Sequence, residues 1–123
     1  MVDDERRVLI DLPFEMAVGA VTGAIQREGL TILARIDVRD HFKTWLHHDF
    51  RQYALLEAWV PALAFEEIRA DLDEGAATPI RFAVYELADG ETAIIVDRRS
   101  TPATRVMGRL RRLPRAAAEM PAA

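Results

Sequence analysis

Residues 14–38, FEMAVGAVTGAIQREGLTILARIDV, decide the fold, because the spacing of their apolar side chains changes within a few positions. In the first half, apolar residues recur every three or four positions, as on one face of a helix: Phe14, Val18, Val21 and Ile25. In the second half they alternate with their neighbours, as on one face of a strand: Leu30, Ile32, Ala34, Ile36 and Val38. Gly29 lies at the change and suits the left-handed conformation that ends many helices. We therefore predict a helix directly followed by a strand.

The segments on either side have the same two kinds of pattern. Strand-like runs cover residues 6–12, 53–60, 80–87 and 92–96, and the last two are joined through Asp89-Gly90, a strong hairpin signal. A helix is predicted over residues 61–72, where Pro61 is the first residue, and another over residues 101–113, where Thr101 is the cap. A short helix is predicted over residues 40–46. We predict an α+β fold in the order strand-helix-strand-strand-helix-strand-strand-helix. Its single sheet is mixed, mainly antiparallel and of about five strands, with helices on one face.

Length and composition set limits on function. The chain of 123 residues suits one domain, placed at residues 1–113, and the small residues and prolines of 114–123 predict a disordered tail. Cysteine is absent, which excludes disulfides, thiolate metal sites and a cysteine nucleophile. No apolar run approaches the roughly 20 residues that span a bilayer, and the first residues are acidic where a secretory signal is basic. We expect a cytoplasmic protein with no membrane partner.

Charge is distributed unevenly along the chain. Residues 1–97 contain nine basic and 19 acidic residues, whereas residues 98–123 contain seven basic residues and one acidic residue. This asymmetry favours docking of the basic end on the acidic body, or pairing with a second copy, over binding of an external anion. A calculated pI of about 5.4 also disfavours nucleic acid as a partner.

Several short motifs together resemble the domain-of-unknown-function family 302. They are Ile36-Asp37-Val38, the run DFRQYALL at residues 49–56, Pro61, Gly75 with Thr78-Pro79, Val84-Tyr85-Glu86 and Asp89-Gly90. Their order and spacing resemble the family across roughly residues 8–100. The resemblance implies a small α+β domain that associates as a homodimer and has no established biochemical activity.

Two departures from the family pattern bear on chemistry. Many relatives have a Cys-Asn-Pro element after the third strand, where this chain has Trp59-Val60-Pro61. Many also have a Leu-Pro-Cys element before the fourth strand, where this chain has Thr78-Pro79-Ile80. Tryptophan and isoleucine neither ligate metals nor attack electrophiles, so thiol or metal chemistry at these positions is excluded. If this chain keeps a site there, we expect a pocket without thiol chemistry that Trp59 fills or lines.

The third and fourth predicted strands supply the candidate ligand-binding residues Tyr53, Trp59 and Arg81. Tyr53 and Trp59 share one strand face, where aromatic residues usually belong to a core or dimer interface and can also form a pocket wall. Arg81 suits an anionic ligand, although pairing with Glu86 or a neighbouring carboxylate is the simpler interpretation. Glu57, mid-strand among apolar residues, either faces solvent or has a raised pKa and a specific role.

The histidines His41, His47 and His48 form the cluster with metal-ligand chemistry. None of their spacings is the three or four residues that places two ligands on one helix face, so an exposed turn is the simpler interpretation. A zinc or haem site would take His47 and His48 with distant ligands or ligands from a dimer mate.

The sequence favours a non-enzymatic homodimer that binds a small ligand or a protein partner through Tyr53, Trp59 and Arg81. The alternative is a metal- or haem-dependent enzyme or carrier that uses His47 or His48. A third hypothesis makes dimerisation the whole biochemical role. Whether the protein is an enzyme stays open, and no cofactor can be named from the sequence.

Overall fold

The computed structural model describes residues 6–113, and the predicted tail at residues 114–123 lies outside the described residues. The elements follow the predicted order, with two additions: the predicted short helix lies between the second and third strands, and a 3-10 helix precedes the fourth strand. Their bounds are β1 Arg7–Ile10, α1 Phe14–Arg27, β2 Thr31–Asp37, α2 Val38–Leu46, β3 Tyr53–Trp59, α3 Pro61–Ala70, η2 Leu72–Ala76, β4 Ile80–Ala88, β5 Glu91–Val96 and α4 Thr101–Arg111.

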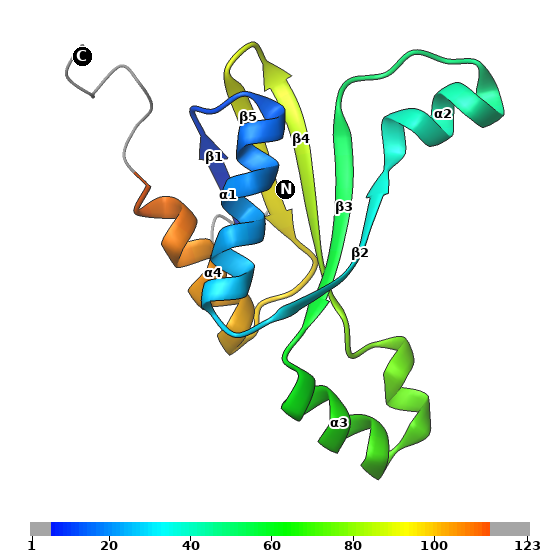
Figure 1. The fold of residues 1–123 in the computed structure, drawn as a ribbon, viewed down its shortest axis with the longest axis vertical. Helices are drawn as coiled ribbons and strands as arrows, with labels where there is room; N and C mark the ends of the chain where they lie inside the picture. The colour runs from blue at the N-terminus through cyan, green and yellow to red at the C-terminus, as the bar shows by residue number, and fades with distance from the viewer. Residues whose placement is uncertain (1–5, 114–123) are drawn as a thin grey trace.

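The five strands form one sheet in the order β1-β5-β4-β3-β2. Every neighbouring pair within residues 6–113 is antiparallel, so the described sheet has no parallel pair. Helices α1 and α4 lie side by side on one face, while α2 and α3 extend beyond opposite ends of the central strands (Figure 1). The predicted α+β class with one sheet of about five strands is confirmed. Helices α1 and α4 lie on one face as predicted, whereas α2 and α3 lie beyond the ends of the strands.

The hydrophobic core lies between the sheet and helices α1 and α4. Both helices contribute buried aliphatic side chains that meet the inward side chains of three central strands: Val21, Ile25, Val106, Met107, Leu110, Leu56, Phe82 and Ile94. The buried polar residue Thr92 donates its hydroxyl to the carbonyl of Leu12 at 2.8 Å, which meets its hydrogen-bonding need.

Local sequence signals explain most element boundaries. Gly29 ends α1 in the left-handed region at φ 84°, and Gly90 closes the β4–β5 hairpin at φ 76°, both as predicted. Pro61 opens α3 as predicted. The cap of α4 is Ser100 rather than Thr101, because the Ser100 hydroxyl accepts a hydrogen bond from the backbone amide of Ala103 at 3.3 Å.

The second strand departs from its predicted alternation at a β-bulge between Ile32 and Ala34. Ile32 lies opposite Ala58 on the core side, but after the bulge it is Arg35 that faces this side, opposite Leu56. A bulge adds one residue to one strand and so exchanges the two faces beyond it. The expectation that Ala34 and Ile36 continue the core face is therefore wrong.

Arg35, which the bulge turns toward the helices, forms two ion pairs. Arg35 reaches Glu15 of α1 and Asp37 of its own strand, each at 3.0 Å. The hydrogen bond to Glu15 is the largest cause that raises the pKa of Arg35 above its ordinary value. The expected strand residue Val38 instead begins α2, with Asp37 rather than Asp40 as the residue before the helix.

Candidate functional site

The sheet face turned away from α1 and α4, here called the open face, carries side chains in rows across the strands. The register defines three rows: Leu9, Ala93, Tyr85 and Tyr53; then Arg7, Ile95, Ala83, Leu55 and Ile36; then Arg81, Glu57 and Ala34. Leu9 remains 53% exposed on this face. The middle of the open face is thus apolar, with aromatic rings on one side of it and an ion pair on the other.

The three predicted ligand-binding residues are spread along the open face. Tyr53 stacks on Tyr85, with ring centroids 5.2 Å apart and planes within 11°. Trp59 lies six residues further along β3, which is about 20 Å away at the rise of an extended strand. Arg81 lies between these two positions in the strand register. The structure therefore does not bring Tyr53 and Trp59 into one pocket.

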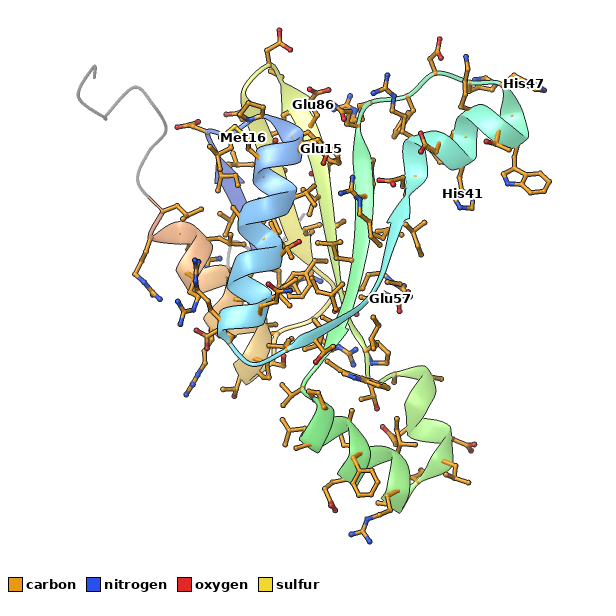
Figure 2. The ribbon with its side chains drawn as sticks, in the orientation of Figure 1. Glu15, Met16, His41, His47, Glu57 and Glu86 are labelled. Carbon is orange, nitrogen blue, oxygen red and sulfur yellow. The ribbon has the colours of Figure 1, made fainter. Side chains whose placement is uncertain are left out.

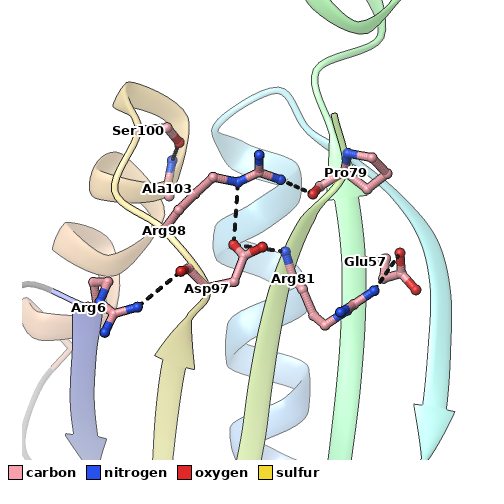
Figure 3. Close-up of polar contacts among 8 residues, drawn as sticks. All are labelled: Arg6, Glu57, Pro79, Arg81, Asp97, Arg98, Ser100 and Ala103. Atoms are coloured by element: carbon pink, nitrogen blue, oxygen red, sulfur yellow. Dashed lines mark hydrogen bonds and ion pairs between the residues drawn. The ribbon is translucent and has the colours of Figure 1, made fainter. Parts of the chain in front are cut away.

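Arg81 forms an ion pair with Glu57, its direct cross-strand partner, at 3.7 Å (Figure 3). The predicted neighbouring carboxylate is therefore Glu57 rather than Glu86. Glu57 faces the open side with 24% of its side chain exposed, and the guanidinium supplies a compensating charge. No unusual acid-base role is needed to explain this mid-strand carboxylate.

The histidines lie on the arm formed by α2 and the loop after it. His47 ends α2 in the left-handed conformation at φ 56°, and His41 projects from the helix itself (Figure 2). All three histidines are exposed. Within residues 6–113, no three histidine, aspartate or glutamate side chains lie close enough to hold a metal ion. Metal binding through His47 and His48 stays a prediction that requires ligands from elsewhere.

The ends of β3 and β4 form a hollow of about 330 Å³, here called the β3–β4 hollow. Ala58 pairs with Ile80 across the two strands, so the chain leaving β3 lies next to the chain entering β4. Trp59-Val60-Pro61 and Thr78-Pro79-Ile80 are thus neighbours. The lining residues are Trp59, Val60, Leu63, Ala64, Glu67, Glu74, Ala77, Thr78, Ile80, Arg98, Ser100 and Pro102.

Hydrogen bonds hold the walls of the hollow in place. Thr78 Oγ1 lies 2.7 Å from the carbonyl oxygen of Glu74 and 3.2 Å from the Glu67 carboxylate. Arg98 reaches across from the end of β5 and donates to the carbonyl of Pro79 (Figure 3). These contacts join three segments that are distant in the sequence.

Sequence reasoning singled out Trp59 and the Thr78-Pro79-Ile80 element, but it missed Glu67, Glu74 and Arg98. Glu67 and Glu74 read as ordinary solvated charges around the end of a helix. Arg98 follows β5 and reaches the hollow through the β4–β5 pairing, so the hairpin predicted from Asp89-Gly90 was the available signal for it. The antiparallel pairing of the predicted third and fourth strands was the available signal.

These features define a small α+β domain built on an open, antiparallel five-stranded sheet with a hollow at one end of its central strands. The chain belongs to the family described as domain of unknown function DUF302, whose model matches residues 6–122. The predicted family resemblance is confirmed.

A solved structure has a similar fold. The crystal structure of an uncharacterized conserved DUF302 protein from Bacillus stearothermophilus superposes with a TM-score of 0.65 and 17% identity, covering 85% of this chain and 88% of that chain. No curated protein matches the sequence. No helix in residues 6–113 is long and apolar enough to cross a membrane.

Proposed function

We propose that the protein is a homodimeric binding domain. Two copies pair through their open faces, and each β3–β4 hollow takes a small ligand beside Trp59. The observation that carries the proposal is the pair of features on β3 and β4, an uncovered apolar face along the strands and a hollow at their ends.

The open face has the composition of a dimer interface. Its central row offers Leu55, Ile95 and Ile36, while Tyr53 and Tyr85 supply stacked aromatic rings. Aromatic and aliphatic residues dominate the buried centre of protein interfaces, and a second sheet at about 10 Å is the simplest cover for an apolar sheet face. Self-association through one face generates a closed two-fold dimer.

The β3–β4 hollow has the mixed lining typical of small-molecule sites. Apolar walls from Trp59, Leu63 and Ile80 surround a few polar groups, and the volume of about 330 Å³ falls at the lower end of known ligand pockets. This volume suits a small molecule.

The dimer is tested by placing a charge in the middle of the open face. Leu55→Glu is expected to convert a dimer of twice 13.9 kDa into a monomer, because each interface would bury an unpaired carboxylate. Sedimentation velocity gives the mass, and circular dichroism checks the fold. Trp45→Glu is the control, since Trp45 lies on α2 and is 76% exposed. A monomeric parent protein, or a folded Leu55→Glu dimer, would contradict the proposal.

Ligand binding is tested by native mass spectrometry of the protein as purified, together with an absorbance spectrum. An added mass that decreases in Trp59→Ala while the dimer persists is the expected result. A parent dimer with no added mass, which dissociates in Trp59→Ala, would instead support dimerisation as the whole role. A Soret band or metal-sized mass that disappears in the His47→Ala/His48→Ala variant would replace the proposal with the histidine alternative.

A further inference from the structure

Three charged side chains line the β3–β4 hollow, and the one cation among them is already engaged. Arg98 donates to the carbonyl of Pro79, and its Nε lies 3.6 Å from the carboxylate of Asp97. Figure 3 shows this guanidinium spanning from the end of β5 to the start of β4. The guanidinium therefore stabilises the wall of the hollow, and the Asp97 carboxylate lies beside it.

The two carboxylates of the hollow, unlike Arg98, have no oppositely charged partner within the described residues. Neither Glu67 nor Glu74 forms an ion pair within residues 6–113, whereas the adjacent Glu66 lies 2.9 Å from Arg69. Thr78 approaches both the Glu67 carboxylate and the Glu74 carbonyl, at 3.2 and 2.7 Å. One hydroxyl has one hydrogen to donate, so it cannot satisfy both acceptors at once. The hollow thus keeps acceptor capacity and negative charge for a ligand.

The remaining walls favour an organic cation over a metal ion. Trp59, Leu63, Ala64, Ile80 and Pro102 present apolar surface, and an indole ring also attracts a cation positioned over its face. Calcium takes six to eight oxygen ligands, more than the hollow offers, and a magnesium ion with its retained waters would leave the apolar walls without a partner. An ammonium group has three donors that suit these acceptors, and its apolar substituent suits the walls.

We propose that the β3–β4 hollow binds a small protonated amine with an apolar substituent. Glu67 and Glu74 accept from the ammonium group, and Trp59 packs on the substituent. This inference rests on the proposed ligand-binding function of the same hollow and adds the chemical class of the ligand. The acidic body of the chain, with 19 acidic against nine basic residues in 1–97, raises the local concentration of cations.

The test compares three phenethyl probes of different charge by protein-observed NMR, namely phenethylammonium, 2-phenylethanol and 3-phenylpropionate, with magnesium chloride alone as the metal probe. Phenethylammonium is expected to shift the amide signals of Ala64, Thr78 and Ile80 and to bind at least about tenfold more tightly than the alcohol. The Glu67→Gln/Glu74→Gln variant should lose at least about tenfold in affinity for the amine. Glu66→Gln, a control one residue away, should bind like the parent protein.

Several results would overturn the amine proposal. Equal binding of the alcohol and the amine would show that the hollow does not recognise positive charge. If 3-phenylpropionate or magnesium binds at the hollow and phenethylammonium does not, the ligand belongs to another chemical class. The proposed ligand-binding function would then stand. If none of the probes shifts the signals of the hollow, the amine proposal fails, whereas ligand binding by the hollow and the proposed dimer are each decided by their own tests, native mass spectrometry and sedimentation velocity.

Discussion

Lys43 and Asp49 form an ion pair on the surface of the protein. The Lys43 ammonium lies 3.0 Å from the Asp49 carboxylate across the turn that follows α2. The hydrogen bond from Lys43, and then its charge, lower the pKa of Asp49 below its ordinary value. Both side chains are largely exposed, so salt screens their attraction. The pair orients the end of the α2 arm more than it stabilises the fold.

Replacing Lys43 by methionine is expected to raise the pKa of Asp49 toward its ordinary value. A lowered pKa in the folded state means that the pair stabilises the fold above the unfolded pKa and loses this effect as the pH falls through the folded pKa. An NMR titration of the Asp49 carboxyl signal measures the change, and Arg39→Met serves as a control because Arg39 is the weakest of the causes. An unchanged Asp49 pKa in Lys43→Met would contradict the assignment.

The elements depend on caps, glycines and strand pairing to different extents. Glycine and proline signals predicted the ends of α1 and α3, because these residues limit the backbone wherever they occur. The bulge in β2 could not be predicted, because Leu33 and Ala34 fit a regular alternation as well as an interrupted one. Only the pairing with β3, and the ion pair of Arg35 with Glu15, decide which face each residue takes. The hollow depends on the same kind of long-range pairing.

The cap of α4 gives a test at the level of one helix. Ser100→Ala is expected to reduce the free energy of unfolding by about 1 kcal/mol, because the first turn of the helix loses its side-chain acceptor. Thr101→Ala, the control, should change the free energy by less than about 0.5 kcal/mol, since Thr101 is exposed. Urea denaturation of both variants measures the difference. A larger loss in Thr101→Ala would place the cap where the sequence first suggested it.

At the level of the whole molecule, α4, the described part of the basic end, packs on the body of the chain, which is one of the alternatives that the charge pattern favoured. Arg109 of α4 forms an ion pair with Glu28 at the end of α1. The same helix buries Val106, Met107 and Leu110 completely or almost so. A partly exposed ion pair is worth about 1 kcal/mol or less, whereas each large buried side chain contributes several times that amount. Hydrophobic packing therefore holds α4 in place, and the ion pair adds a smaller contribution.

This ranking predicts unequal effects of two substitutions. Met107→Ala should reduce the free energy of unfolding by about 2–5 kcal/mol, because it leaves a cavity between α4 and the core. Glu28→Gln should cost about 1 kcal/mol, and the cost should decrease as salt is added. Urea denaturation at low and high salt compares them. A greater loss in Glu28→Gln than in Met107→Ala would reverse the ranking.

The bulge in β2 also affects how the edge strands of the sheet can pair with other chains. Strands β1 and β2 form the two edges of the sheet, and each has backbone groups that another chain could pair with. The bulge between Ile32 and Ala34 interrupts this row on β2, and β1 has only four residues. Both features disfavour edge-to-edge growth into fibrils. At high concentration, the edges of the sheet therefore give little template for open-ended polymers, and the proposed face-to-face dimer would remain a finite assembly.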